Sequence, residues 1–280
     1  MTDLAVGFVG LGNIGKPMAL RLAAADGIAL GVYDVAPEPV AELAAAGATT
    51  AGSVAELAGT VEVLCVMVRD DDQVREVLGE ALGAAREGLT ICVHSTVAPA
   101  TPRMLEQTAS RHGLRLVDAP VSGGPMGAAE GTLAILVGGT DEAYAAARPA
   151  LEPMGSRIVH AGPIGAGTAM KLARNLMHFV AFTAATEAQR LAEAAGLDLV
   201  ELGHVVRHTD AITGGPGAIM HRDTTAPLTE DDFWYGVLDH VRALGEKDLS
   251  FAIELAATLG VDVPLAQLAR ENLAKGLGLP

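Results

Sequence analysis

A lysine and an asparagine stand four residues apart in a long run of helix-forming residues. After its two opening glycines, the run from Gly165 to Ala195 contains no Gly or Pro and is dominated by Ala, Leu and Met. Such a composition predicts one helix about 40 Å long, too apolar for a solvated surface and therefore buried between other elements. Lys171 and Asn175 then share one face. Either Lys171 extends its ammonium into water, or burial has lowered its pKa and equipped it for proton transfer.

A second group of residues matches a phosphate-binding turn. The apolar run Leu4 to Val9 has strand length and leads directly into Gly10-Leu11-Gly12-Asn13-Ile14-Gly15, ahead of a helix-like run. This G-x-G-x-x-G spacing permits a tight turn, close approach of a pyrophosphate and close packing of helix on strand. The next strand ends in Asp34, placed to accept a hydrogen bond from a ribose 2′-hydroxyl. No arginine follows it in residues 35–38, which favours NAD over NADP.

A second glycine-rich stretch covers residues 118–132 and contains Ser122-Gly123-Gly124. No helical pattern begins at Gly123, so the stretch is expected to be a loop. It is either a flexible connector or a nest of backbone N–H groups beside a serine hydroxyl, suited to a small anion such as a carboxylate.

The elements that must position these residues alternate between strand and helix. Parallel pairing in an open sheet is therefore expected, with ligands at the carboxyl ends of the strands. Asp34, Val68 with Arg69, Thr96 and Ser122 all fall at or just beyond such ends. Further strands are expected at 28–33, 61–68, 89–93, 114–117, 133–137 and 156–160, and helices at 16–25, 37–46, 54–58, 70–86, 99–112 and 141–151. Ser53 and Glu56 form a predicted capping box on the third of these helices.

After Gly196 the strand pattern stops. Helices are expected at 199–208, 238–259 and 265–277, with a polar loop region at 210–229. The predicted organisation is a dinucleotide-binding domain at 1–163, a long interdomain helix at 164–195 and a helical domain at 196–280. Lys247 and Asp248 are adjacent in one of these helices, so their side chains are not expected to face each other.

Composition excludes several classes of function. The 280 residues carry a net charge of −15 and no basic run, which argues against nucleic acid and anionic membrane surfaces as partners. Two cysteines, Cys65 and Cys92, lie in apolar strand-like runs and are interpreted as small buried hydrophobes, with no disulfide framework and no metal site. Because neither a signal peptide nor a membrane span is visible, a cytoplasmic protein is expected.

Several motifs in one order resemble the β-hydroxyacid dehydrogenase family, typified by 3-hydroxyisobutyrate dehydrogenase. The resemblance covers essentially the whole chain. Arg69 stands where the family usually has Pro, His94 where a small or acidic residue is common, and residues 208–235 match no family pattern. The motifs are residues 7–19, 118–124, 127–133, 165–175 and 246–249, which read GFVGLGNIGKPMA, DAPVSGG, GAAEGTL, GAGTAMKLARN and EKDL.

The resemblance implies a Rossmann-type parallel sheet domain, a long interdomain helix and an all-helical domain that makes homodimer or homotetramer contacts. It implies Lys171 as the catalytic acid/base, with Asn175 and the Ser122-Gly123-Gly124 loop holding the substrate. By the same resemblance, the expected cofactor contacts include Val68, Arg69, Thr96 and Lys247.

The reaction expected from these residues is hydride transfer between NAD and a small 3-hydroxy acid. A semialdehyde-acid reductase of the tartronate or succinate semialdehyde type and a serine-like 3-hydroxy amino acid dehydrogenase stay open as alternatives. Asp34 argues against NADP-linked reductases of that kind, and Lys171 against an imine reductase, which replaces this lysine. A non-catalytic dinucleotide-binding module is disfavoured because both Lys171 and Asn175 are present. A 6-phosphogluconate-type enzyme would need a larger helical domain and a basic phosphate-binding cluster, and the sequence shows neither.

Overall fold

A computed structural model describes residues 3–280, and the chain divides into two compact units, Met1–Arg174 and Asn175–Pro280. The division falls inside one long helix, α8 (Ala166–Ala194). Within the described residues, no helix combines the length and the apolar composition needed to cross a membrane.

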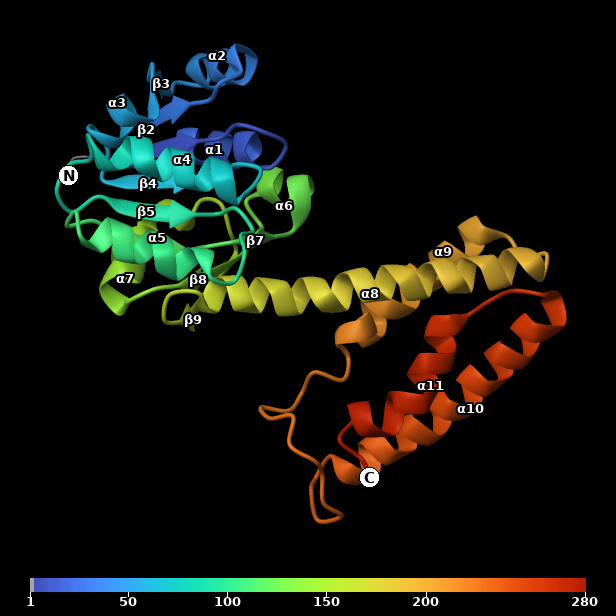
Figure 1. Cartoon of the computed structure of the whole chain (residues 1–280). Coiled ribbons are helices and arrows are strands. Elements are labelled where there is room, and N and C mark those ends of the chain that lie inside the picture. Colours follow the sequence, from blue (N-terminus) through green and yellow to red (C-terminus); the bar gives the residue numbers. More distant parts are fainter. Residues whose placement is uncertain (1–2) are drawn as a thin grey trace. The chain divides into compact units, whose positions relative to one another are not determined.

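The first unit is built on one sheet with helices on both faces (Figure 1). Eight strands follow the spatial order β3-β2-β1-β4-β5-β6-β8-β7, and β9 pairs with β8. The strands are β1 (Leu4–Val9), β2 (Ile28–Tyr33), β3 (Thr49–Thr50), β4 (Val63–Val66), β5 (Thr90–Val93), β6 (Arg115–Asp118), β7 (Val121–Ser122), β8 (Ala134–Gly138) and β9 (Arg157–Gly162). The helices before α8 are α1 (Gly15–Ala23), α2 (Pro37–Ala45), α3 (Val54–Ala58), α4 (Asp71–Leu82), α5 (Thr101–Ser110), α6 (Gly124–Glu130) and α7 (Asp141–Leu151).

Two apolar cores cover the two faces of this sheet. Helices α3, α4 and α5 pack on one face through residues such as Leu57, Val77 and Leu105. Helices α1, α6 and α7 pack on the other through residues such as Met18 and Leu151. Strands buried on both faces explain the continuous apolar runs in the sequence. Cys65 and Cys92 are neighbours in the β4–β5 register and are both fully buried, as expected for small hydrophobes.

The sheet is mostly parallel, and this Rossmann-type fold class is confirmed. From β3 through β6 all pairs are parallel, whereas β8 runs antiparallel to both β6 and β7. The expected parallel pairing therefore does not extend to this edge of the sheet. Strand β7 continues in the direction of β6, and the chain reverses between Ser122 and Ala134. A strand as short as β7 cannot be recognised from hydrophobic runs.

The glycine-rich stretch also contains a helix, α6, where a loop was expected. Gly123 and Gly124 both have positive φ, and Gly124 begins the helix with Pro125 in its first turn. Proline is favoured in the first turn of a helix because the N–H groups there have no partner within the helix, so the missing N–H of proline costs no hydrogen bond. The Gly and Pro residues that indicated a loop therefore start a helix instead.

The second unit is helical, as expected. It contains the greater part of α8 together with α9 (Leu199–Thr213), the short 3-10 helix η1 (Gly215–Gly217), α10 (Tyr235–Leu259) and α11 (Pro264–Gly276). The buried carboxylate of Glu187 accepts hydrogen bonds from the N–H groups of Leu265 and Ala266 and so holds the start of α11 against α8. Helix α9 is longer than the expected 199–208.

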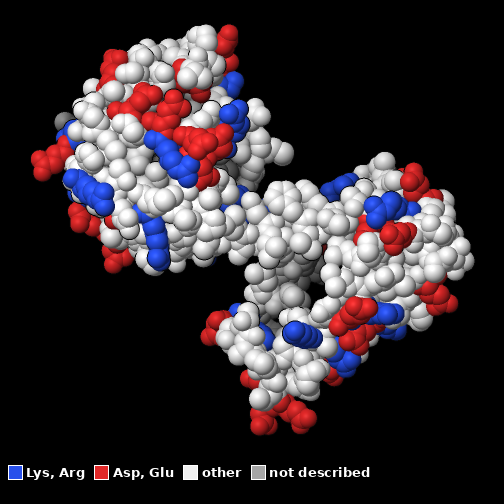
Figure 2. All heavy atoms as spheres, in the orientation of Figure 1, with Lys and Arg blue, Asp and Glu red and all other residues white. Residues whose placement is uncertain are grey.

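Helix α8 is less buried than its apolar composition predicted. Within a single chain many of its large apolar side chains are exposed, and Figure 2 shows an uncharged surface over the middle of this helix. The exposed fractions are 70% for Leu176, 59% for Phe179, 48% for Val180 and 53% for Phe182. The expected burial of this helix between other elements is therefore not found within the single chain.

Candidate functional site

The turn between β1 and α1 has the geometry of a phosphate cradle. Gly10 has φ +91°, and an added Cβ there would overlap the carbonyl of Met67. A Cβ on Gly15 would overlap the carbonyl of Gly10, so this glycine permits the close packing of helix on strand. At Gly12, by contrast, no heavy atom of the described chain lies within 4 Å of an added Cβ. The backbone is therefore open to a ligand where a pyrophosphate would approach.

The start of α1 suits an anion as well. Among residues 3–280 no side chain caps this helix; Ile14 occupies the cap position with its apolar side chain. The N–H groups of the first turn and the positive end of the helix dipole therefore face the open side of the turn. Leu11, Asn13 and Ile14 complete this turn, as the G-x-G-x-x-G spacing predicted.

Asp34 joins the second strand to the glycine turn. Its Oδ2 accepts a hydrogen bond from the N–H of Leu11 at 2.5 Å, and its Oδ1 accepts one from the N–H of Ala36 at 2.8 Å. These bonds fix the carboxylate at the carboxyl edge of the sheet, and each oxygen retains capacity to accept a further bond from a ribose hydroxyl.

A cavity of about 280 Å³ lies against these residues. Gly10, Gly12, Asp34, Val68 and Arg69 all line it, so the structure brings five predicted cofactor residues together. Three carboxylates line the cavity, and Arg69 is the one cation among its described lining residues. The rest of the lining is Val9, Tyr33, Val35, Val54, Met67, Gln73, Glu76, Val77 and Glu80.

The segment that carries Thr96 is tied to the end of β4 through Ser95. The Ser95 Oγ accepts a hydrogen bond from the N–H of Val68 at 2.9 Å and donates one to the Val68 carbonyl at 2.7 Å. Thr96, the next residue, is exposed. Thr96 does not line the cavity itself, but Ser95 fixes its distance from Val68, which does.

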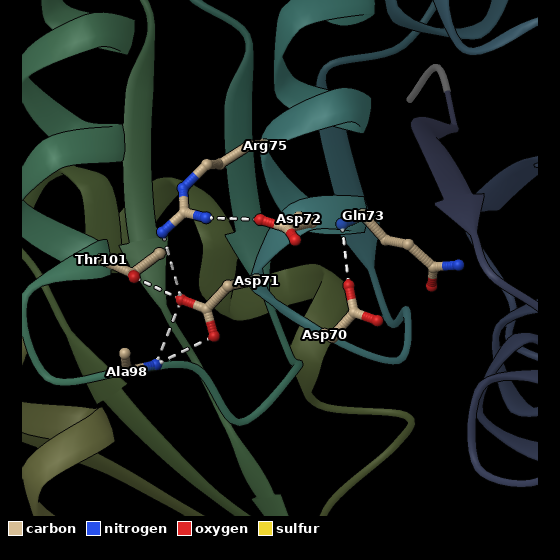
Figure 3. A network of polar contacts seen from close by, with 7 residues as sticks. All are labelled: Asp70, Asp71, Asp72, Gln73, Arg75, Ala98 and Thr101. Carbon is tan, nitrogen blue, oxygen red and sulfur yellow. Dashed lines mark hydrogen bonds and ion pairs between the residues drawn. The ribbon is translucent and has the colours of Figure 1, made fainter.

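A network of polar contacts at the start of α4 holds the other end of the segment that carries Thr96 (Figure 3). The Asp71 carboxylate accepts hydrogen bonds from the Ala98 N–H, at 3.1 and 3.2 Å to its two oxygens, and from the Thr101 hydroxyl. Asp70 caps α4 by accepting the Gln73 N–H at 3.0 Å, and this bond lowers the pKa of its carboxyl. The loop from Ser95 to Thr101 is thus fixed at both ends.

The predicted anion-binding residues follow the carboxyl end of β6, in the same antiparallel register with β8. Ser122 is the last residue of β7 and pairs with Ala134 of β8. It is partly exposed, and Gly123 and Gly124 follow it with positive φ. In the sequence, the residues whose backbone N–H groups start α6 therefore follow directly after Ser122.

Lys171 is buried in the second turn of α8, with 9% of its surface exposed. Burial lowers the pKa of its ammonium, and the positive charge of nearby Arg174 lowers it further. Both effects favour the neutral amine, which is the form that accepts a proton. The structure thus favours a buried lysine over one that extends into water.

Two predicted residues belong to the second unit. Asn175 lies one turn after Lys171 on α8 and is the first residue of that unit. Lys247 lies in the middle of α10, with its ammonium 3.2 Å from the Asp248 carboxylate. The side chains of Lys247 and Asp248 were not expected to face each other, but the flexible lysine side chain lets the ammonium reach the adjacent carboxylate.

Comparisons with known proteins agree with this geometry. Residues 5–162 match the model of the NAD-binding domain of 6-phosphogluconate dehydrogenase, and residues 165–277 match the model described as NAD-binding of NADP-dependent 3-hydroxyisobutyrate dehydrogenase. The crystal structure of an oxidoreductase from Mycobacterium avium is 50% identical with a TM-score of 0.96, covering 99% of this chain and 100% of that one.

Two relatives from Pseudomonas aeruginosa have named activities. Its 3-hydroxyisobutyrate dehydrogenase is 36% identical over 286 residues, covering 96% of this chain and 90% of the relative. Its NAD-dependent L-serine dehydrogenase is 35% identical over 272 residues, covering 94% and 89%. The chain belongs to the β-hydroxyacid dehydrogenase family. It is an NAD-dependent oxidoreductase, as the turn at Gly10 and the acid at Asp34 predicted.

Three buried polar residues of this β-hydroxyacid dehydrogenase were not singled out as site residues by their sequence pattern. Ser95 bridges to Val68, and the buried His94 ring lies with its Nδ1 2.9 Å from the carbonyl of Ala119. Asp118 accepts hydrogen bonds from the first turn of α8. Each lies at the last residue of a buried strand or within two residues beyond it. A polar residue at a strand's carboxyl end is the signal that identifies such positions.

Proposed function

We propose that this β-hydroxyacid dehydrogenase oxidises a small 3-hydroxy acid, resembling 3-hydroxyisobutyrate, with Lys171 as the acid/base. The observation that carries the proposal is a buried lysine of lowered pKa, in the same unit as a dinucleotide cradle. NAD, when bound, supplies the hydride acceptor. The chain itself supplies binding, orientation and a proton acceptor.

Lys171 is proposed to take the hydroxyl proton as the alcohol is oxidised. In the reverse direction its ammonium gives the proton to the developing alkoxide. Both roles require a lysine pKa below its ordinary value, and the burial of Lys171 has that effect. Asn175, one helical turn later, is proposed to bond the same substrate or to orient the Lys171 amine.

Ser122, Gly123 and Gly124 are proposed to bind the substrate carboxylate. The Ser122 hydroxyl and the N–H groups that follow it are donors of the kind that an anion requires. A carboxylate held there leaves the substrate hydroxyl for Lys171. Hydrogen bonds to a charged group are the stronger kind, so this loop would favour hydroxy acids over simple alcohols.

The cofactor residues follow from the cradle. Gly10 to Gly15 are proposed to hold the pyrophosphate, with Asp34 on the 2′-hydroxyl of the adenosine ribose. Val68, Arg69 and Thr96 are proposed as further contacts, and Lys247 of the second unit as another. Glu76 and Glu80 line the same cavity and add to the repulsion that a 2′-phosphate would meet from Asp34, so NAD is preferred over NADP.

Two alternative substrates stay within this mechanism. A serine-like 3-hydroxy amino acid offers the same carboxylate and hydroxyl, and a tartronate- or succinate-type semialdehyde is reduced by the reverse reaction. A panel of these acids with NAD or NADH, followed by absorbance of NADH, distinguishes them. Activity confined to substrates without a carboxylate would contradict the proposed substrate class.

Lys171→Met tests the proposed acid/base. The methionine has similar length but no titratable nitrogen, so kcat should fall by about 100-fold or more. The dissociation constant of NAD should hardly change, because the glycine turn is formed by other residues. Near-normal turnover at neutral pH would exclude Lys171 from the chemical step.

The exposed apolar side chains of α8 are proposed to be covered by a second copy of the chain, in a homodimer or homotetramer formed through the helical unit. Contiguous apolar surface of this kind is uncommon on monomers. Replacing Leu176 and Phe179 together by Glu should shift the mass measured by light scattering toward the monomer. The matched control is Met104→Glu, at an exposed apolar position on α5. A monomeric wild-type chain at micromolar concentration would refute this assembly.

A further inference from the structure

A buried carboxylate holds the start of the helix that carries Lys171. Asp118, the last residue of β6, is only 1% exposed. Its Oδ1 accepts a hydrogen bond from the N–H of Gly165 at 2.7 Å, and its Oδ2 accepts one from the N–H of Thr168 at 2.6 Å. Burying a carboxylate is costly unless such donors compensate it. Burial raises the pKa of Asp118, and these backbone bonds oppose that rise.

Two glycines let the first turn of α8 approach the sheet. A Cβ on Gly167 would overlap the carbonyl of Leu136 and would lie 2.7 Å from the carbonyl of Asp118. A Cβ on Gly138 would overlap the Asp118 carboxylate and would lie 2.9 Å from the N–H nitrogen of Gly167. Side chains at either position would push the helix away. We call Asp118, Gly138 and Gly167 the α8 seat.

The α8 seat lies at the junction of the two groups proposed to handle the substrate. Lys171 follows Gly167 by four residues, one turn along the same helix face. Ser122 follows Asp118 by four residues and pairs with Ala134 of β8, the strand that also contains Gly138. The α8 seat therefore fixes both the helix that carries Lys171 and the strand that carries Ser122.

We propose that Asp118 is a positioning residue, which fixes the first turn of α8 so that the Lys171 amine keeps its place relative to the Ser122 loop. The inference rests on the proposed function for the chemical role of Lys171. Misplacement of a reacting group by about 1 Å can cost about 100-fold in rate, so a seat of this rigidity has a direct effect on turnover. Asp118 itself touches neither substrate nor cofactor in this scheme.

Two substitutions disturb the α8 seat by different physical means. Asp118→Asn removes the charge and replaces one accepting oxygen by a donor that cannot bond an N–H group. Gly167→Ala changes no charge and displaces the helix by steric overlap. The matched controls are Asp198→Asn, which alters a carboxylate that caps α9 through Val200 and Glu201, and Gly79→Ala, in mid-α4, where an added Cβ meets no described atom within 4 Å.

The decisive readout is the chemical reactivity of Lys171 in the full folded chain without substrate. Competitive acetylation with acetic anhydride, quantified by mass spectrometry across pH, gives the pH-independent reactivity of the neutral amine. Both seat variants should raise this reactivity, because a loosened first turn exposes the buried amine, whereas the controls should match the wild type. Turnover should fall about 10- to 100-fold in the seat variants, with the dissociation constant of NAD unchanged.

A purely structural role for Asp118 predicts a different result. The seat variants would then melt at lower temperature but retain wild-type Lys171 reactivity and wild-type kcat, and this outcome would overturn the proposal. If Gly167→Ala does not fold, Asp118→Asn decides by the same readout. Retained turnover in Lys171→Met would defeat the proposed function instead, since the acetylation result is independent of catalysis.

Discussion

Acidic pH should destabilise the first unit through one buried histidine. The His94 ring is 1% exposed and is stacked at 10° to the ring of Phe8. Its Nδ1 lies 2.9 Å from the carbonyl of Ala119, while its Nε2 has no partner within residues 3–280. The neutral ring with its proton on Nδ1 satisfies that carbonyl. Burial lowers the pKa of His94 from 6.5 to about 4.

The size of the effect follows from linkage. Below pH 6.5 the unfolded chain binds a proton at His94 that the folded chain does not bind until about pH 4. The unfolding free energy therefore falls as pH falls through this window, by about 3 kcal/mol in full and about 2 kcal/mol between pH 7.5 and pH 5. About one pH unit above 6.5 the contribution is fully present.

His94→Gln isolates this contribution, because glutamine can donate to the Ala119 carbonyl but does not titrate. Urea unfolding followed by circular dichroism at pH 7.5 and pH 5 measures the loss, and hydrogen exchange of peptides covering β5 assigns it to the first unit. The variant should lose about 2 kcal/mol less than the wild type over this interval. The control is His112→Gln, whose exposed ring bonds the carbonyl of Thr108. Equal losses in wild type and His94→Gln would refute the reasoning.

Two further predictions concern the ligands. Asp34→Asn should weaken NAD binding about 10- to 150-fold, the equivalent of one hydrogen bond to a charged group. Fluorescence titration with both cofactors measures the dissociation constants. Steady-state kinetics of the wild type provide a second test, because a kcat/KM for NADP equal to that for NAD would contradict the assignment. Ser122→Ala should lower kcat/KM for a hydroxy acid about 10- to 150-fold and leave the corresponding ester nearly unaffected; equal losses for acid and ester would show that Ser122 does not bind the carboxylate.

The local sequence predicts those parts of the molecule that are formed by residues close together in the chain. The turn from Gly10 to Gly15 requires small residues within six positions, and its strand and helix flank it directly. The cap of α3 is likewise local: Ser53 accepts the Glu56 N–H, three residues later, as predicted. The Glu56 carboxylate, however, bonds the N–H of Gly52 rather than that of Ser53.

The seat of α8 is the opposite case. Asp118 lies 47 residues from Gly165 and 50 from Thr168, so no spacing rule relates the carboxylate to the helix that it caps. In the motif that contains Asp118, only the serine and the glycines have a recognisable anion-binding pattern. Only the pairing of β6 with β8 brings the carboxylate to the helix start. Long-range capping of this kind depends on topology, which hydrophobic periodicity does not specify.

Helix α8 is apolar in composition but exposed within the single chain. Its composition requires burial, yet within one chain Leu176, Phe179 and Phe182 remain more than half exposed. Exposed contiguous apolar surface of this kind is uncommon on monomers. The sequence shows how apolar a helix is but does not show which molecule packs on it. The first turn of α8 is the exception: there the chain provides its own seat, and Lys171 is buried one turn beyond it.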